Sequence, residues 1–515
     1  MYDVAIIGAG IAGMATAARL QARELKTIVL ESHGQPGGCA GFFRRKGFSF
    51  DVGATTLVDF EPGGVGGELL ESIGMPSLEG EQLPGYVAWL PDRVVTLHRA
   101  TDQWTRERLR AFGDTPAHQA FWRLLDQLAR VFWKASRVGV KLPIQSWADA
   151  VRAGRAVGLD NLHLARYVRW TLADALRSYG LAYNRPLVGL LAMLVEDTVH
   201  GTVADAPLIN AALGITIRGA GLTRSRGGMR GFWQRFVARY RALGGELRVG
   251  CAVNSVGGGD GTYRLATRRG VIAARQIVCA VPAGLAAQLG PPQVAEALLP
   301  YLRRDAAAHG GAIAVFLGVP DREVTNQAFT HHQLMYDYDR PLGVGNNMFV
   351  SVSAAGDLES APPGHRAVMI STHCELAPWE GLASETYLAQ KREVGELLIA
   401  LAQRVYPELG RDPLVYEVAT PRTYERFTNR PRGAVGGVRQ TLRNANQHAI
   451  PHDLGIPGYW VAGDTTWPGL GTVAGCLCSR LVAEGVISRA GRYRFVPAKA
   501  AVSVRGAARV HCNAF

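Results

Sequence analysis

The stretch YDVAIIGAGIAGMATAARLQARELKTIVLE, residues 2–31, decides the fold of this chain. It begins with an apolar run typical of a buried strand, continues through the glycine turn GAGIAG at residues 8–13, and then shows helical periodicity to about Arg23. A second apolar run follows and ends at Glu31. The order of strand, glycine turn, helix and strand predicts a parallel βαβ unit of a dinucleotide-binding fold.

Each glycine of this turn has its own physical role. Gly8 permits a sharp turn, Gly10 lets the backbone approach a pyrophosphate, and Gly13 lets the helix pack closely on the strand. The helix N-terminus then faces the phosphate charge. Glu31 can accept hydrogen bonds from an adenosine ribose. Glu24 stands where a helix-ending glycine is common, which costs about 1 kcal/mol at most.

Length and composition indicate a globular protein of two or three lobes. The chain has 515 residues, of which 48% are hydrophobic and 19% are charged, and this balance excludes an intrinsically disordered chain. The longest apolar runs are shorter than the roughly 20 residues of a membrane-spanning helix. The 7 cysteines are scattered and outline neither a disulfide framework nor a zinc site. We therefore expect no metal site. We also expect a cytoplasmic protein, because the first predicted strand begins at residue 2.

Two further glycine-rich stretches favour FAD over NAD as the dinucleotide. The first is PGGCAG at residues 36–41, which lets the backbone approach another part of a long, bent ligand. The second is AGDTTWPGLGTVAG at residues 462–475, which follows a short strand and opens a helix. Asp464 can accept hydrogen bonds from ribityl hydroxyls. The helix N-terminus near Gly471 and Thr472 can direct its dipole at the electron-rich end of a reduced flavin.

In this order and over almost the whole chain, these motifs resemble those of the FAD-dependent phytoene desaturase and carotenoid isomerase family. The motifs GFSFDVGAT at residues 47–55, RGGM at residues 226–229 and TPRTY at residues 420–424 belong to the same resemblance, and FDVGAT with EPGG at residues 61–64 looks most like the carotenoid 3',4'-desaturase branch. The resemblance implies that FAD is contacted by Gly8, Gly10, Gly13, Glu31, Gly37, Gly38, Gly463, Asp464, Gly471 and Thr472, and that the backbone of Val253 binds adenine. Ser32 and Thr465 depart from the residues usual in the family, but neither removes a group that the cofactor needs.

The predicted fold class is α/β, with a discontinuous Rossmann-type FAD-binding domain and an inserted α+β substrate domain. The FAD-binding domain would consist of residues 1–85, 222–295 and 436–489. The substrate domain would consist of residues 86–221 and 296–435, and residues 490–515 would form a loosely ordered tail. The middle FAD segment is predicted to contain a helix at residues 231–243 and strands at residues 246–256, 263–267 and 270–280.

Positive charge is concentrated in one segment. The net formal charge is +13, and residues 99–240 hold 21 Lys and Arg against 10 Asp and Glu, together with 6 of the 10 tryptophans. Residues 117–137 have an apolar helical stripe of Phe121, Leu125, Leu128, Phe132 and Ala135 opposite a basic face. This pattern fits a helix in a membrane interface or one packed on a protein core. We expect peripheral membrane association and, without a nucleic-acid-binding motif, no nucleic-acid partner.

The resemblance implies desaturation of a lipophilic polyene by hydride transfer to flavin N5, with a quinone or oxygen as the final electron acceptor. A redox-neutral cis-trans isomerase on the same scaffold is the first alternative, a flavin amine oxidase the second, and a flavin-bearing scaffold without turnover the third. An apolar tunnel should bind the polyene, and its candidate walls, residues 187–195 and 209–217, are equally compatible with core helices.

The sequence does not identify a catalytic base. Glu196, Asp197 and His200 follow an apolar run and are candidates for a tunnel wall, with a capping or solvent-facing role as the alternative. The isolated His331, His332 and His373 are equally undecided, and Arg422 and Arg426 either hold the flavin's pyrimidine edge or are surface charges.

Overall fold

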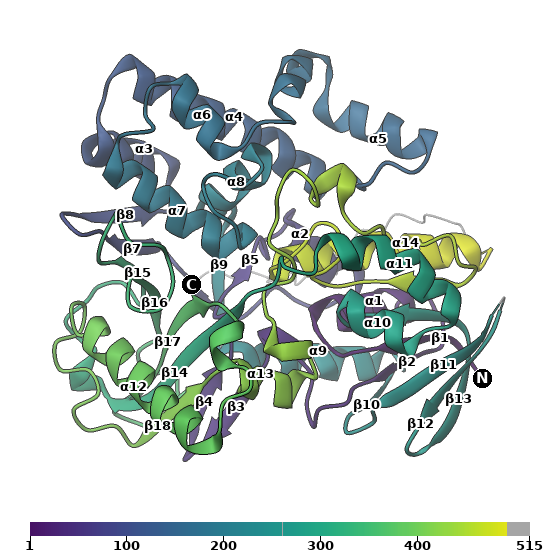
Figure 1. Ribbon diagram of the computed structural model, residues 1–515. Coiled ribbons are helices and arrows are strands. Elements are labelled where there is room, and N and C mark those ends of the chain that lie inside the picture. The colour runs from purple at the N-terminus through teal and green to yellow at the C-terminus, as the bar shows by residue number, and fades with distance from the viewer. Residues whose placement is uncertain (260, 492–515) are drawn as a thin grey trace, which may run out of the picture.

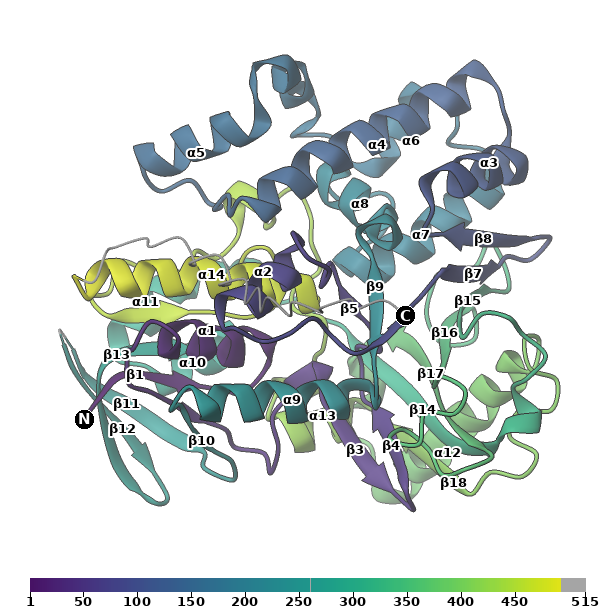
Figure 2. The ribbon, with the colours of Figure 1, turned by 180° about the vertical axis from the view of Figure 1, so that it is seen from behind.

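Two β-sheets and a separate group of helices build the molecule (Figure 1). The computed structural model describes residues 1–259 and 261–491, so the predicted tail lies almost entirely outside the described residues. In Figure 1 the helical group lies above both sheets, and the first sheet, which contains the N-terminal strand, lies at the lower right. Figure 2 shows the same arrangement from behind, with helix α9 (Gly228–Ala242) running below the first sheet's other helices.

The first sheet joins strands from three distant parts of the chain. Its order is β10-β2-β1-β13-β12-β11, and β19 also pairs with β13. The strands are β1 (Tyr2–Ile7), β2 (Thr27–Leu30), β10 (Glu246–Arg248), β11 (Val253–Gly259), β12 (Thr262–Thr267), β13 (Gly270–Cys279) and β19 (Tyr459–Val461). Because β1 is parallel to both β2 and β13, and β13 is parallel to β19, the carboxyl ends of these strands meet at one edge. This sheet and its helices confirm the predicted discontinuous α/β fold.

Helices cover both faces of this sheet. One face packs against α1 (Ile11–Gln21), α2 (Val65–Ser72), α9 and α14 (Thr472–Arg489), which share one hydrophobic core. The other face packs against α10 (Ala283–Leu289) and α11 (Pro292–Arg304). Buried apolar area on both sides is the main stabilising contribution to such a layered sheet.

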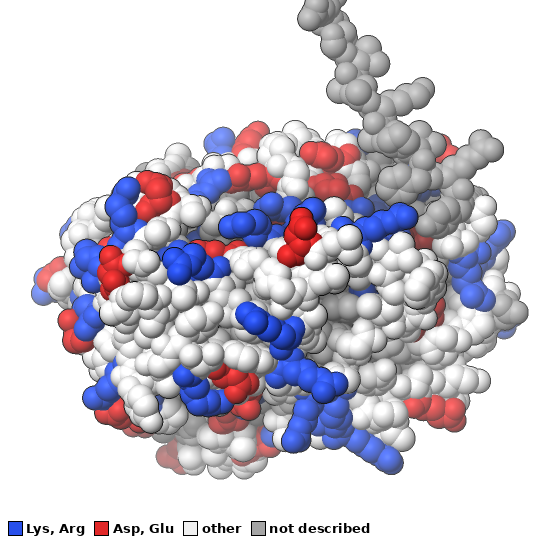
Figure 3. Space-filling model, turned by 90° about the horizontal axis from the view of Figure 1, so that it is seen from above, with Lys and Arg blue, Asp and Glu red and all other residues white. Residues whose placement is uncertain are grey.

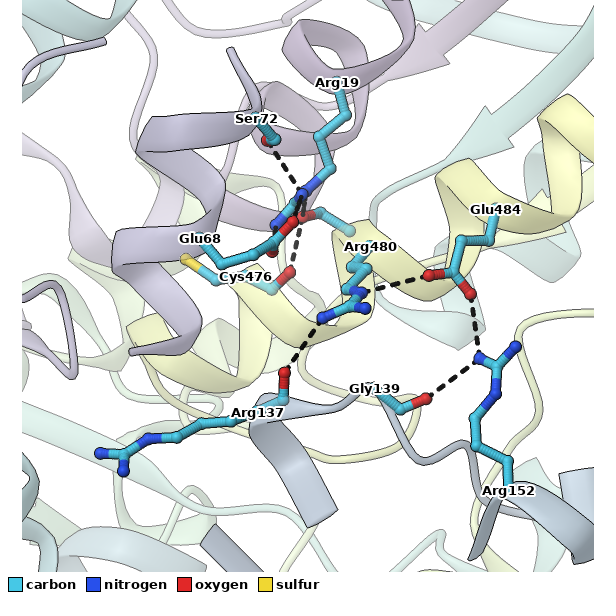
Figure 4. Close-up of polar contacts among 10 residues, drawn as sticks. Arg19, Glu68, Ser72, Arg137, Gly139, Arg152, Cys476, Arg480 and Glu484 are labelled. Carbon is cyan, nitrogen blue, oxygen red and sulfur yellow. Dashed lines mark hydrogen bonds and ion pairs between the residues drawn. The ribbon is translucent and has the colours of Figure 1, made fainter. Parts of the chain in front are cut away.

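A buried arginine ties three of these helices together (Figure 4). The guanidinium of Arg19, on α1, is only 7% exposed and donates two hydrogen bonds to the Glu68 carboxylate on α2, at 2.8 and 2.6 Å. The same guanidinium also donates to the hydroxyls of Ser72 on α2 and Ser479 on α14, at 3.0 and 3.1 Å. Bidentate, charge-assisted bonds of this kind fix the helices' relative positions as well as adding stability.

The second sheet has the order β18-β14-β17-β16-β15-β7-β8. Its strands are β7 (Gly85–Trp89), β8 (Val94–His98), β14 (Gly311–Pro320), β15 (His331–Met335), β16 (Asn347–Val352), β17 (His365–Cys374) and β18 (Val415–Ala419). Helix α12 (Ser384–Ala402) packs on one face, and the hairpin of β3 (Phe42–Arg45) and β4 (Phe48–Asp51) packs on the other. A small third sheet has the order β5-β9-β6, with strands β5 (Leu57–Val58), β6 (Gly80–Gln82) and β9 (Leu222–Ser225). Helix α13 (Pro421–Thr428) follows β18 in the chain.

The helical group consists of six α-helices, five of which share a hydrophobic core of their own. They are α3 (Thr101–Phe112), α4 (Pro116–Arg137), α5 (Trp147–Val157), α6 (Leu172–Ser178), α7 (Arg185–Val199) and α8 (Leu208–Ile215). No α-helix within residues 1–259 and 261–491 is both long enough and apolar enough to cross a bilayer. The predicted tunnel walls, residues 187–195 and 209–217, are mainly core helices, because most of their apolar side chains are fully buried.

The interfacial interpretation of residues 117–137 is wrong. These residues form α4 as predicted, but the apolar side chains of Phe121, Leu125 and Leu128 are fully buried in the core of the helical group. Trp122 is buried as well, beneath the guanidinium of Arg108 at 5.0 Å from its ring. A single apolar stripe is equally suited to lipid and to a protein core, and only the neighbouring helices decide between them.

Two local backbone features lie beside the first sheet: one corrects a predicted strand and the other explains an unusual residue at a helix end. The strand predicted at residues 246–256 is divided into β10 and β11, because Gly250 between them adopts φ = +59°. Glu24 adopts φ = +63°, the left-handed conformation that glycine takes without strain. Its backbone therefore occupies the position at which the sequence indicated a missing helix-ending glycine.

Candidate functional site

One large cavity, with a volume of about 1340 Å³, is lined by all three segments that supply the first sheet and also by the second sheet. The lining residues include ten of the eleven predicted FAD contacts: Gly8, Gly10, Glu31, Gly37, Gly38, Val253, Gly463, Asp464, Gly471 and Thr472. Gly13 is the exception, since it lies behind the turn. The cavity therefore brings together residues that the sequence places more than 400 positions apart, and the assignment of each to FAD remains a prediction.

The first glycine turn has the geometry of a ligand cradle. A Cβ atom added at Gly8 would lie 2.8 Å from the Ala280 carbonyl oxygen, and one added at Gly13 would lie 2.1 Å from the Gly8 carbonyl oxygen. Packing therefore requires glycine at both positions. A Cβ at Gly10 would meet no protein atom within 4 Å, because it would point into open space at the cavity wall. The space beside Gly10 fits the close approach of a cofactor phosphate.

Glu31 follows the last residue of β2 and reaches back to this turn. Its carboxylate accepts hydrogen bonds from the backbone N–H groups of Ala9, at 2.7 Å, and His33, at 2.8 Å. The second glycine turn lies alongside, because the Gly37 N–H donates to the Ala9 carbonyl oxygen at 2.9 Å. Gly37 adopts φ = +133°, which favours glycine at this point of closest approach.

The C-terminal glycine-rich stretch forms another wall of the cavity. Asp464 receives a hydrogen bond from the Arg430 guanidinium at 2.6 Å, in an ion pair that is largely buried. Although burial lowers the pKa of Arg430, the Asp464 carboxylate raises it further, so the net shift is upward. Gly471 adopts φ = +107° and immediately precedes Thr472, the first residue of α14. The N-terminus of this 18-residue helix therefore opens onto the cavity.

The structure divides the undecided polar residues into two groups. Glu196, Asp197 and His373 line the cavity, as do Arg422 and Arg426. His200, His331 and His332 are buried side chains outside the lining of the cavity. The Arg422 guanidinium donates to the Leu382 carbonyl oxygen at 2.6 Å and lies 4.4 Å from the centre of the Tyr387 ring, so this arginine is held in place by the second sheet's helix and its preceding loop.

Sequence reasoning missed three polar residues at this site. Gln333 on β15 and Asn347 on β16 line the cavity beside Asp197 and Glu196, and Arg430 pairs with Asp464. No motif or spacing marks any of the three, because each is brought into place by strand pairing or by a loop far along the chain.

Comparison with known proteins agrees with this architecture. The profile of the family described as "Flavin containing amine oxidoreductase" matches residues 11–486. The chain is 24% identical to the prolycopene isomerase of Arabidopsis thaliana, covering 94% of this chain and 83% of that protein. It is also 24% identical to the lycopene-forming phytoene desaturase of Pantoea ananas, covering 95% of this chain and 99% of that protein.

Among solved structures, cyclohexylamine oxidase from Brevibacterium oxydans has a TM-score of 0.59 at 18% identity, covering 95% of this chain and 100% of that chain. This likeness concerns the fold. The relatives confirm the family resemblance inferred from the motifs, and the flavin family confirms the predicted cofactor class. The chain belongs to the flavin-containing amine oxidoreductase family, and it is an FAD-dependent oxidoreductase.

Proposed function

We propose that this protein desaturates a lipophilic polyene of the carotenoid class. The observation that carries the proposal is a single cavity that extends from the glycine turns to a wall formed by the helical group and the second sheet. Apolar and aromatic side chains, among them Val58, Tyr86, Met193, Ile217 and Phe349, contribute to the lining of the cavity together with polar ones. A hydrocarbon has no charged group for recognition, so its binding must come from burial of apolar area. The relatives that act in lycopene chemistry support the same substrate class.

The chain's own residues would hold FAD between the two glycine turns and the start of α14. Gly10 leaves room for the pyrophosphate. The Glu31 carboxylate would bind the ribose, and the Asp464 carboxylate, which pairs with Arg430, would bind the ribityl chain. When bound, FAD supplies a two-electron acceptor. The N-terminus of α14 would stabilise negative charge at one end of the flavin ring, and the apolar wall would exclude water from the reacting carbons.

Redox-neutral isomerisation is the second candidate, and the prolycopene isomerase relatives support it. Expression in bacteria that make lycopene or neurosporene separates the two. Loss of two hydrogens from the pigment by mass spectrometry supports desaturation, whereas unchanged mass with an altered spectrum supports isomerisation. Unchanged pigment, together with peroxide release from a panel of amines, would refute both and favour an amine oxidase.

We also propose a quinone or oxygen as the final electron acceptor, and peripheral association with membranes. The face seen from above (Figure 3) has wide uncharged areas with basic and acidic side chains interspersed. Since the apolar face of α4 is buried, exposed apolar side chains elsewhere in the helical group are better candidates for lipid contact. Trp147, at the start of α5, is 83% exposed, and Leu159, in the following 3₁₀ segment Leu159–Tyr167, is 84% exposed.

A further inference from the structure

A cluster of ionisable side chains lies in the cavity wall where the helical group meets the second sheet. Glu196 and Asp197 come from the last turns of α7, and His373 comes from β17. The Glu196 carboxylate accepts a hydrogen bond from the Asn347 side-chain amide, and its Oε2 lies 3.5 Å from His373 Nδ1. These elements come from different parts of the chain, so the cluster is a product of tertiary structure. Ionisable groups with perturbed pKa values that face a cavity are typical of functional sites.

Asp197 is the member that faces open space. Its side chain is accessible from the cavity. The protein that surrounds the cavity nevertheless shields its carboxyl from bulk water and so raises its pKa, an effect that the charges of Arg218 and His373 partly offset. Its Oδ2 accepts a hydrogen bond from Gln333 Nε2 at 3.4 Å. Within residues 1–259 and 261–491, no Lys, Arg or His nitrogen lies within 4.0 Å of its carboxylate oxygens. The carboxylate is therefore oriented and open to a ligand.

A buried arginine lies behind this carboxylate. Arg218, in the 3₁₀ turn Ile217–Ala220, is 4% exposed, and its Nη2 donates to Gln333 Oε1 at 3.3 Å. The guanidinium also lies 4.9 Å from the centre of the Tyr86 ring, while its Nε and Nη1 find no acceptor among the described residues. Gln333 thus connects a positive charge to Asp197 without neutralising it. The charge of Arg218 favours the carboxylate form of Asp197 and partly offsets the effect of burial, but the net shift of the Asp197 pKa stays upward.

The Glu196–His373 pair controls the charge next to Asp197. Burial lowers the pKa of His373, but hydrogen bonding and attraction to Glu196 raise it more, so the net shift is upward. The His200 ring lies 4.7 Å from the His373 ring, and burial lowers the pKa of His200 to about 2, which keeps it neutral. A protonated His373 cancels the charge of Glu196. Asp197 is then spared the repulsion of a second carboxylate on the neighbouring residue.

The cluster also lies close to the predicted flavin site. The backbone N–H of Gln440 donates to the Val199 carbonyl oxygen, at 3.1 Å, at the end of α7. The side-chain amide of Gln440 donates to the Pro468 carbonyl oxygen at 3.1 Å, in the glycine-rich stretch before α14. One residue therefore joins the helix that bears Asp197 to the loop that leads into the N-terminus of α14.

From this geometry we infer that Asp197 is the catalytic base of the desaturation and that His373 positions its charge; the inference rests on the proposed function. Two C–H bonds on adjacent carbons must break. FAD, when bound, would accept the first hydrogen as a hydride, and the Asp197 carboxylate would take the second as a proton. The electron pair left by that proton forms the new carbon–carbon double bond. The protonated Asp197 returns its proton to solvent before the next turnover.

The decisive variant is Asp197→Asn, compared with wild type in the flavin-loaded protein with a lycopene-pathway polyene. We expect unchanged flavin content and polyene binding but a desaturation rate lower by about 100-fold or more, the usual contribution of a general base. Asp102→Asn, at an exposed carboxylate on α3, is the matched control and should match wild type. If Asp197→Asn desaturates within about threefold of wild type, the assignment of the base is overturned.

The pH profile separates a base from a structural residue. In wild type the rate should rise with pH as Asp197 loses its proton, and Asp197→Asn should lack this limb. His373→Gln should move the limb to higher pH, because Glu196 then stays negative beside Asp197. Two other ionisable groups face Asp197, and neither changes its charge across this pH range. Arg218 stays positive because it is a guanidinium, and Tyr86 stays neutral because burial raises its pKa to about 12. A limb unmoved in His373→Gln overturns the positioning role.

A measurement without turnover provides the second readout. Because the folded-state pKa of Asp197 is raised, the native state binds its proton more tightly than the unfolded state. Wild type should therefore lose stability relative to Asp197→Asn as pH rises from the unfolded pKa, about 4, through the folded value. A pH-independent difference would overturn the raised pKa. If wild type leaves the mass of every polyene unchanged, the proposed desaturation fails and the base with it. If wild type desaturates and Asp197→Asn does so within about threefold of its rate, only the assignment of the base is refuted.

Discussion

Alanine substitutions at two glycines of the same turn should have opposite consequences. At Gly10 the backbone has φ = −72° and an added methyl meets no protein atom within 4 Å, so alanine fits the folded chain. At Gly13 the added methyl would lie 2.1 Å from the Gly8 carbonyl oxygen and 3.0 Å from the Ala280 Cβ. The first substitution fills space that belongs to the cofactor, and the second fills space that belongs to the protein.

The expected magnitudes follow from these contacts. At Gly13 a backbone oxygen must retreat by about 1 Å, and overpacking of this kind costs about 1–3 kcal/mol or more. A 2.1 Å approach to a backbone oxygen places the cost at the upper end of this range, about 3 kcal/mol. Alanine's higher helix propensity returns about 1 kcal/mol, so Gly13→Ala should lower the free energy of unfolding by about 2 kcal/mol. Gly10→Ala should leave it unchanged or raise it by about 0.4–1 kcal/mol. The same methyl should weaken FAD binding by about 1–3 kcal/mol, or roughly 5- to 150-fold.

Urea unfolding of the apoprotein, followed by circular dichroism, measures the first quantity, and titration of the apoprotein with FAD, followed by flavin fluorescence, measures the second. Gly154→Ala is the matched control, because Gly154 lies in α5 and its added methyl also meets nothing within 4 Å. It should bind FAD as wild type does. FAD binding by Gly10→Ala at wild-type affinity would refute the cradle, as would an apoprotein of Gly10→Ala that unfolds as easily as Gly13→Ala.

Three further predictions concern charge and membrane contact. Burial raises the pKa of Glu68, but hydrogen bonds from Arg19 lower it more, so the net shift is downward. The ion pair of Arg19 and Glu68 therefore stabilises the folded protein above pH 4–5, and this stabilisation is lost as pH falls through the pKa of Glu68 in the folded state. Glu68 is 33% exposed, so solvent screens part of the ion pair, and Glu68→Gln should lower the free energy of unfolding by about 1–3 kcal/mol at pH 7. Urea unfolding at several pH values measures this difference, and a difference that persists at acid pH would refute the role of the Glu68 charge. Asp464→Ala should abolish the yellow flavin that co-purifies, while the far-ultraviolet circular dichroism stays native; full flavin content would exclude Asp464 as a contact. Trp147→Ala should reduce flotation with anionic liposomes severalfold, and undiminished flotation would exclude α5 from lipid contact.

The first βαβ unit was determined by the sequence alone, because its geometry is local. Gly8 and Gly13 are needed where turn, strand and helix touch within a few residues, and the spacing to Glu31 follows from the length of one helix and one strand. The left-handed backbone at Glu24 has the same local origin. Patterns of this range are visible in the chain itself because neighbouring residues impose them.

The sequence predicted where α4 lies but not what covers it. Periodicity defines an apolar stripe, and the burial of Phe121, Leu125 and Leu128 depends on helices that pack against it from elsewhere. The strand predicted at residues 246–256 failed for a related reason, since Gly250 interrupts it only because its backbone turns to φ = +59°. Hydrophobic pattern alone does not specify which partner an element meets.

The candidate base could come only from the tertiary structure. Glu196 and Asp197 are adjacent, but nothing in the sequence relates them to His373 on β17 or to Arg218 and Gln333. Asp197 acquires its raised pKa from burial and its orientation from an amide on β15. Desolvation and charge–charge attraction act over a few ångströms in space, irrespective of separation along the chain. Folding therefore decided which carboxylate faces the cavity, whereas the sequence had already determined the turn that faces the cofactor.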